Sequence, residues 1–194
     1  METKKSQVFG KAKSGIFAGL VGGFALFSSF IGIDSHLGIE PGTFYKMIGI
    51  SIGLDGIGAI TFGFVVHMLT ASLIGSVFYA ISSLHRSLNL VTIPKAILVG
   101  GITGLMVFAL FFIPIYTLVM VPIIESIIES GTEPVISQSF GTQTVSLKTL
   151  ISNTEGLFLG SIILHMLFGM VMGFFCGLMA HEEYSKVRRY NKFL

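Results

Sequence analysis

Charged residues are scarce in this sequence, and their scarcity indicates the class of protein. Asp, Glu, Lys and Arg make up only 11% of the 194 residues, whereas soluble domains carry about 25%. Hydrophobic residues make up 52%, and a folded chain of this size lacks the interior volume to bury so many apolar side chains. Lipid must therefore solvate part of the surface. The net charge of +2 is too small to indicate nucleic-acid binding.

Cysteine is almost absent as well. Cys176 is the single cysteine and lies inside an apolar run. It cannot form a disulfide within the chain or build a cysteine-based metal cluster, and we interpret it as a small buried residue. No Ala-x-Ala cleavage site follows the first apolar run, so this run is predicted to be a retained membrane span rather than a secretory signal.

Motifs that carry enzymatic chemistry are missing too. The sequence has no Gly-rich phosphate loop, no nucleophile elbow and no zinc-protease helix. No apolar run carries an acidic residue near its middle, which disfavours an ion-coupled transporter. These absences favour a protein that is not an enzyme.

Four long apolar runs dominate the sequence. A bilayer core of about 30 Å requires about 20 apolar residues in a helix, and the four runs cover residues 14–33, 57–82, 96–123 and 156–180. Each is predicted to be a helix, because a backbone in lipid must satisfy its own hydrogen bonds. Pro114 and Pro122 are expected to kink the third. The predicted fold is an all-α membrane protein, a four-helix transmembrane bundle in a single domain over residues 1–194.

The positions of the basic residues predict the orientation. Ten of the twelve Lys and Arg residues precede the first run, follow the fourth, or lie between the second and third. The exceptions are Lys46 and Lys148. Because basic loops stay inside, both termini are predicted to be cytoplasmic in a multi-pass protein of the cell membrane.

The two predicted outer connections are residues 34–56 and 125–155. Residues 41–54 of the first connection are expected to form a short interfacial helix that begins after Pro41 and Gly42. In the second, a polar stretch at 131–144 precedes a short amphipathic segment at 145–152.

The two halves of the chain resemble each other. Two sets of residues recur, each at one constant offset, with the change of offset in the outer connection. The first set matches Lys13, Gly19, Gly22, Phe30, Ile31 and Ile33 with Lys95, Gly101, Gly104, Phe112, Ile113 and Ile115, and the second matches Gly58, His67, Met68, Leu69 and Gly75 with Gly156, His165, Met166, Leu167 and Gly173. We predict two tandem in-out-in hairpins, a parallel pseudo-repeat whose axis follows the membrane normal.

His67 and His165 are the candidates for a metal or cofactor site. Each lies about ten residues, or about 15 Å, inside the outer end of its predicted span. Two imidazoles can hold a haem, whereas copper or zinc requires further ligands. Nearby soft donors are Met68, Met166, Met170 and Met172. A proton relay is a further alternative.

A structural role for the two histidines is favoured over these sites. Hydrogen bonds from such side chains to a neighbouring helix are common in membrane bundles, so haem or copper is possible but not expected. The hydroxyls available as partners are those of Ser28, Ser29, Thr61, Thr70 and Ser72.

Glycines at helical spacing are predicted to pack helices rather than line a channel. The predicted packing residues are Gly19, Gly22, Gly75, Gly101, Gly104, Gly169, Gly173 and Gly177.

Other polar or aromatic groups are given ordinary structural interpretations. Asp55 is read as a hydrated interfacial carboxylate, residues 181–183 as a solvated helix end, and Phe108, Phe111 and Phe112 as lipid-facing or packing side chains.

The chain resembles the small four-span membrane proteins of bacteria and archaea that carry a histidine in spans two and four and have no assigned activity. The segments concerned are PGTFYKMIG at 41–49, GFVVHML at 63–69 with Gly75, and LHMLFG at 164–169. The resemblance covers most of the chain and implies the same topology. More weakly, the composition looks archaeal, and the size and span number are similar to those of accessory subunits of archaeal copper membrane monooxygenases.

The predicted function is a non-catalytic accessory or scaffold subunit of a membrane complex. Its partners would be lipids and other membrane subunits, or a second copy of the chain. The alternative is a small transporter or channel, or a haem- or metal-binding membrane protein, that uses His67 and His165. The two functions differ in what accompanies the purified protein, either a fixed protein partner or a bound cofactor.

Overall fold

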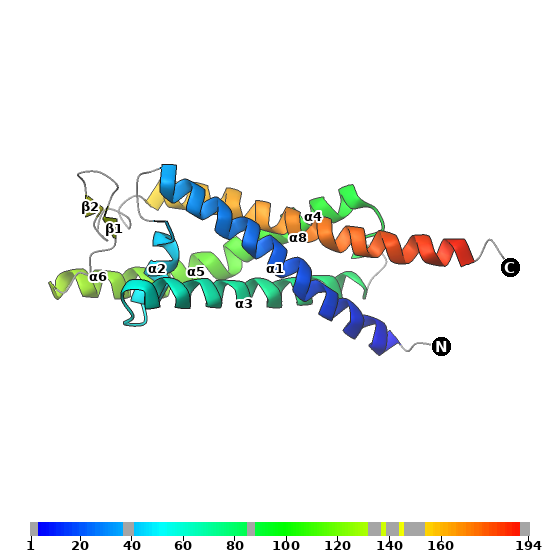
Figure 1. The fold of residues 1–194 in the computed structure, drawn as a ribbon, viewed down its shortest axis with the longest axis horizontal. Coiled ribbons are helices and arrows are strands. Elements are labelled where there is room, and N and C mark those ends of the chain that lie inside the picture. The colour runs from blue at the N-terminus through cyan, green and yellow to red at the C-terminus, as the bar shows by residue number, and fades with distance from the viewer. Residues whose placement is uncertain are drawn as a thin grey trace. The chain divides into compact units, whose positions relative to one another are not determined.

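A computed structural model (Figure 1) describes residues 4–36, 41–84, 88–131, 137–138, 144–145 and 154–190. Among these residues, four helices are long and apolar enough to cross a membrane: Gln7–Gly32, Gly56–Ser82, Ile93–Glu129 and Gly156–Glu182. Large apolar side chains on them stay exposed, for example 64% of Leu69, 65% of Leu98 and 75% of Leu118. Lipid is the solvent for such a surface. The chain is an integral, multi-pass membrane protein, and the prediction of an all-α four-helix bundle is confirmed.

The helical elements follow the four apolar runs. The first, second and fourth spans lie in α1 (Lys4–His36), α3 (Gly56–Ser82) and α8 (Thr154–Tyr190), and α2 (Thr43–Ile50) lies between α1 and α3. The third span consists of α4 (Ile93–Val107), the π-helix η2 (Phe108–Phe112), α5 (Ile113–Ile115), the π-helix η3 (Tyr116–Met120) and α6 (Val121–Glu129).

Several predicted boundaries require correction. α1 continues to His36, and α6 continues to Glu129, so the start of each predicted outer connection is helical. α6 ends where Gly131 adopts a φ of 69° and donates its N–H to the carbonyl of Ile128. The predicted interfacial helix at 41–54 is shorter, Thr43–Ile50, and six of its eight residues are buried.

The second connection also holds a short antiparallel pairing that was not predicted. β1 (Ser137–Gln138) pairs with β2 (Thr144–Val145), and Ser137 lies opposite Val145. The remainder of the predicted amphipathic segment at 145–152 lies outside the described residues.

The chain divides into two compact units. The terminal unit comprises Met1–Ala25, Met68–Met106 and His165–Leu194, and the loop unit comprises Leu26–His67 and Val107–Leu164. The division falls inside α1, α3, α4 and α8. The two units are therefore not separate stretches of sequence.

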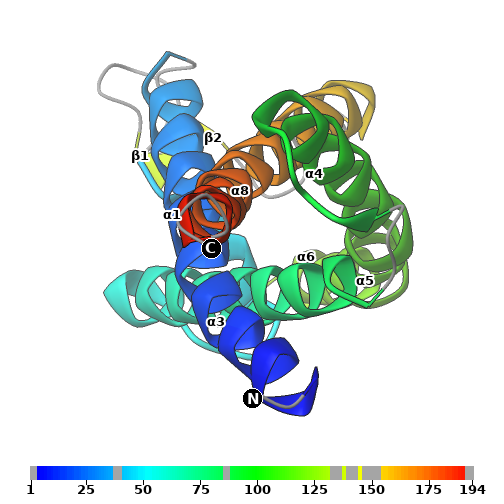
Figure 2. The ribbon, with the colours of Figure 1, turned by 90° about the vertical axis from the view of Figure 1, so that its right-hand side faces the viewer.

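Small residues allow two helix pairs in the terminal unit to pack closely. A Cβ atom on Gly75 would overlap the carbonyl oxygen of Gly15 and would come within 2.6 Å of the Gly19 Cα, so α3 lies directly on the α1 backbone. In the same way, a Cβ on Gly100 would overlap the carbonyl of Gly169, and one on Gly173 the carbonyl of Ala96. Figure 2 shows α4 beside α8, as these contacts require. Only small residues allow backbones this close in a membrane.

The two helix pairs have matching contacts, but in a different register from the one predicted. Gly15 touches Gly75 as Ala96 touches Gly173, and Gly19 touches Ala71 as Gly100 touches Gly169. Equivalent positions in α1 and α4 are then 81 residues apart, whereas the predicted pairs, such as Gly19 with Gly101, are 82 apart. In α3 and α8 the contacts keep the predicted spacing of 98 residues. The internal repeat stays a prediction.

Buried residues in the third span recur at every fourth position from Ala96 to Ile124. The series is Ala96, Gly100, Gly104, Phe108, Phe112, Tyr116, Met120 and Ile124, of which Phe112 alone is only half-buried. In a regular α-helix, positions four apart drift by about 40°, so such a series would wind away from its neighbours. The π-helical segments have more residues per turn, and they keep the outer part of the series on one face.

The two prolines explain where these wider turns occur. A proline ring clashes with the carbonyl of the residue four positions earlier. For Pro114 that residue is Leu110 in η2, and for Pro122 it is Leu118 in η3. The sequence repeats here as FALFFIPI and then YTLVMVPI. The structure thus shows local widening of the helix before each proline, and the expected kinks stay a prediction.

Candidate functional site in the loop unit

The start of α2 is held by a carboxylate from α1. The Asp34 side chain is only 4% exposed, and its Oδ2 accepts hydrogen bonds from the N–H groups of Gly42 (2.8 Å) and Thr43 (3.2 Å). Gly42 has a φ of 91°, a conformation that favours glycine, and therefore offers no capping side chain of its own. Asp34 supplies the oxygen that a Ser, Thr, Asn or Asp at the cap position would otherwise provide.

Burial changes the acidity of this carboxyl group. Removal from water raises the pKa of Asp34 to about 6, and the hydrogen bonds from Gly42 and Thr43 lower it by less. Desolvation disfavours the charged form, whereas donated hydrogen bonds favour it. Asp34 therefore changes its charge in a pH range where an exposed aspartate is fully ionised.

Tyr45 fills the centre of the same region. Its side chain is fully buried, and its ring lies 5.4 Å from that of Phe27 and 5.7 Å from that of Phe44, measured between centroids. Its hydroxyl has no hydrogen-bond partner within the part of the chain that the structure describes. Burial and the nearby charge of Asp34 both raise the pKa of Tyr45, so the phenol stays neutral. An unsatisfied buried hydroxyl costs roughly 1–3 kcal/mol.

α2 packs closely against α3 at two glycines. A Cβ on Gly63 would overlap the carbonyl oxygen of Tyr45, and one on Gly49 would overlap the backbone of Ala59. The two helices therefore meet at two levels without intervening side chains. This close approach brings the Tyr45 ring to the residue that follows Gly63 by one turn, His67.

His67 contacts Tyr45 through its ring. The two rings are edge-to-face, with centroids 5.3 Å apart and planes at 70°. His67 is half-buried and follows Ala59 and Gly63 at four-residue intervals. It has at least one interaction besides this ring contact. Two of the hydroxyls named for that role, on Thr61 and Ser72, donate to carbonyls of their own helix.

His165 lies in the terminal unit and is also half-buried. A Cβ on Gly104 would overlap the His165 carbonyl oxygen, so its backbone takes part in the α4–α8 contact. It stands four residues before Gly169 in a series that continues with Gly173 and Gly177. It, too, has an interaction partner. Each histidine thus occupies a place in a stripe of small residues.

Metal ligands do not gather in the part of the chain that the structure describes. No group of three or more His, Cys, Asp or Glu side chains there could hold a metal ion. Cys176 is fully buried, and so is Met172, whereas Met166 and Met170 are each 38% exposed. Asp55 is exposed, and its Oδ1 accepts the N–H of Gly56 at 2.6 Å, which caps α3. His181 and Glu182 are exposed.

A second aromatic group surrounds the π-helical segments. Phe108, Phe112 and Tyr116 stack in near-parallel pairs with centroids 5.4 and 5.8 Å apart. Phe158 of α8 meets all three edge-on. Phe111 points elsewhere and is 55% exposed. Two of the three phenylalanines singled out in the sequence therefore pack inside the loop unit, and the third is on the surface.

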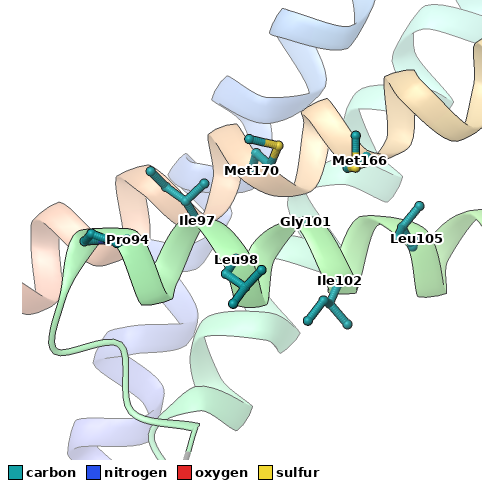
Figure 3. A pocket seen from close by; sticks show the side chains of 8 residues that line it. All are labelled: Pro94, Ile97, Leu98, Gly101, Ile102, Leu105, Met166 and Met170. Atoms are coloured by element: carbon teal, nitrogen blue, oxygen red, sulfur yellow. The ribbon is translucent and has the colours of Figure 1, made fainter.

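An apolar groove runs between α4 and α8 in the terminal unit (Figure 3). It encloses about 280 Å³ and is lined by Pro94, Ile97, Leu98, Gly101, Ile102, Leu105, Met166 and Met170. Gly101 forms part of its floor, because a Cβ there would come 3.1 Å from the Met170 Cγ. Leu98 is 65% exposed and Ile102 50% exposed. The groove is therefore open at the surface of the helix pair.

The predicted packing glycines occupy different kinds of position. A Cβ on Gly22 would come 2.9 Å from the Phe168 carbonyl oxygen, and one on Gly177 would come 2.6 Å from the Ala96 Cβ. The position paired with Gly169 is Gly100, whereas its neighbour Gly101 faces methionine side chains. The other predicted members, Gly19, Gly75, Gly104, Gly169 and Gly173, would each overlap a facing backbone if they carried a Cβ.

Sequence reasoning missed Asp34 and Tyr45 as members of a site. The available signal was an acidic residue at the end of an apolar run, a few positions before a Pro-Gly helix start that has no capping side chain. Ala59 and Gly63, at four-residue steps before His67, also pointed to a close contact on that face.

Comparison with known proteins adds no relative. No protein-family model matches the chain, and no curated protein and no solved structure matches it significantly.

Proposed function

We propose that the chain is a non-catalytic subunit of a membrane complex, and that its α4–α8 face binds a transmembrane helix of a partner protein. The observation that carries this proposal is the apolar groove between α4 and α8. It offers a continuous apolar surface with a glycine in its floor. Small residues at an interface let a second backbone approach closely.

The lining of the groove suits a helix rather than a polar ligand. All eight lining residues are apolar or glycine, so they offer no side-chain hydrogen bond to a substrate. Met166 and Met170 have flexible, polarizable side chains that adapt to the shape of a partner. The contacts behind the groove are made by backbones, through Gly100, Gly104 and Gly169. Such a rigid base matches the role of a scaffold.

The proposed orientation places both termini in the cytoplasm of a cell whose plasma membrane holds the protein. Ten of the twelve basic residues support it, because basic loops are retained on the cytoplasmic side. α4, which follows the linker between the second and third spans, would then begin at the cytoplasmic side. The groove would lie in the cytoplasmic half of the bilayer.

Purification from native membranes tests the partner. The tagged chain, solubilised in mild detergent, should carry one membrane protein at fixed stoichiometry. Gly101→Leu should remove that partner, because the new side chain fills the groove while Gly100 and Gly104 still hold the helices together. Leu118→Phe, an exposed position in the loop unit, is the matched control and should retain it.

Two results would contradict the proposal. One is a parent chain that emerges alone, or only as a self-associated oligomer. The other is a folded Gly101→Leu variant that keeps its partner at full stoichiometry. A variant that loses the partner together with its fold is replaced by Ile102→Ala, which widens the groove without adding bulk.

A further inference from the structure

The strongest unassigned feature is the buried carboxylate that joins α1 to α2. We propose that Asp34 is a proton-operated latch: α2 stays docked in the loop unit while Asp34 is protonated, and its docking weakens when Asp34 ionises. Release of α2 would uncover the Tyr45 ring and give water access to His67. This inference does not depend on the proposed partner.

The geometry makes Asp34 the link between the two helices. The hydrogen bonds that Asp34 accepts from Gly42 and Thr43 cross from α1 to the start of α2. Gly42 occupies the cap position of α2 and has no side chain that could accept these hydrogen bonds in place of Asp34. A change in the charge of the Asp34 carboxyl group therefore acts first on the start of α2.

The docked position of α2 is also the position that buries the charge. Asp34 is 4% exposed and Tyr45 fully buried, and Phe30 stacks on Phe44 with ring centroids 4.5 Å apart. This apolar shell is a poor solvent for a carboxylate. Movement of α2 away from α1 would hydrate Asp34, so the ionised form favours the undocked arrangement.

Other titratable groups of the loop unit leave this assignment intact. On α2 they are Tyr45, whose phenol stays neutral, and Lys46, which is buried and has an interaction partner. α3 contributes His67, which reaches the region through the Tyr45 ring. In the third span, Tyr116 stacks on Phe112, and the carboxylates of Glu125 and Glu129 are exposed. Burial is the largest cause of the shift at Asp34, ahead of its two backbone hydrogen bonds.

The direction of the pH effect follows from the shift. The pKa of Asp34 is about 6 when docked, against 3.8 for the ordinary value that a hydrated, undocked carboxyl group would have. The docked state thus binds the proton more tightly, and its advantage is lost as the pH rises between these two values. From pH 5 to pH 7.5 the ratio of docked to undocked α2 should fall about tenfold.

Hydrogen exchange of the α2 amides in the full-length protein measures this ratio. After correction for intrinsic exchange rates, protection of residues 44–50 should fall about tenfold from pH 5 to pH 7.5. Asp34→Asn keeps an acceptor oxygen but cannot ionise, so its protection should be independent of pH. Asp55→Asn, at the exposed cap of α3, is the matched control and should behave like the parent.

Other outcomes would contradict the proposed role of Asp34. Protection that is constant or rises with pH in the parent would overturn the latch. A pH dependence that survives in Asp34→Asn would assign the effect to another group. Asp34→Ala separates capping from titration, because it should lower protection at both pH values. If Asp34→Ala leaves protection unchanged, Asp34 does not hold α2.

Discussion

At the residue scale, His67 has a structural neighbour that its sequence position did not reveal. Its ring meets the fully buried Tyr45 edge-on, and aromatic pairs of this geometry contribute about 0.5–1.5 kcal/mol beyond area burial. The contact supports a packing role for His67. Haem or metal binding by His67 and His165 stays the alternative to this role.

Substitution of His67 distinguishes these roles. His67→Ala should lower the free energy of unfolding by about 1–3 kcal/mol, since it removes a ring beside Tyr45 and leaves a gap. His67→Phe keeps an aromatic ring and should recover much of that loss. Thermal unfolding in detergent measures the change, and metal analysis with an absorption spectrum records any cofactor. Phe111→Ala, at an exposed aromatic position, should cost far less.

A different pattern would assign His67 to a binding site. If the parent contains haem or metal, and if His67→Ala and His165→Ala each lose it without a change in melting temperature, the packing role is wrong. Rescue of stability by His67→Phe without return of the cofactor would show that both roles coexist.

At the element scale, the third span combines two helical forms to keep one face buried. Pro114 and Pro122 each follow a π-helical segment, and the stack of Phe108, Phe112 and Tyr116 depends on this wider winding. Over eight residues, regular α-helical winding would rotate Tyr116 by about 80° relative to Phe108. We therefore expect the prolines to set the register of the aromatic stack.

Pro114→Ala tests that dependence. Alanine is a much better helix former than proline, so a helix limited only by local propensity would gain stability. We expect the reverse, a loss of about 1–3 kcal/mol, because closure to a regular α-helix would break the stack. Near-UV circular dichroism should show the broken stack as a change in the tyrosine signal, since the chain has no tryptophan. Pro94→Ala, in the first turn of α4, should leave the spectrum unchanged.

One result would contradict this role of Pro114 in the third span. A Pro114→Ala protein that is more stable than the parent and keeps its near-UV spectrum would mean that the π-helical winding has another cause.

At the scale of the whole molecule, the distribution of basic residues predicts which ends face the cytoplasm. The structure suggests suitable probes, because Leu54, Ser130, Leu88 and Thr92 are exposed and native Cys176 is buried. In a Cys176→Ala background, cysteines at Leu54 and Ser130 should react with an impermeant maleimide applied to intact cells. Cysteines at Leu88 and Thr92 should react only after the membrane is opened. The reverse labelling pattern would invert the proposed topology.

The sequence by itself determined the four spans. Length and apolar composition are local properties, and a backbone in lipid has few choices besides a helix. That is why runs at 14–33, 57–82, 96–123 and 156–180 agree with the observed helices apart from their ends. It also located His67, His165 and most of the glycines that lie in helix contacts.

Only the tertiary structure decided how those residues meet. Gly100 rather than Gly101 lies against Gly169, a difference of one residue, or about 100° of rotation around the helix. Rotation is fixed by all neighbours of a helix together, so local pattern cannot supply it. Asp34 and Tyr45 were overlooked for the same reason. Their importance arises from Gly42, Thr43 and His67, whose approach depends on how α2 folds back against α1 and α3.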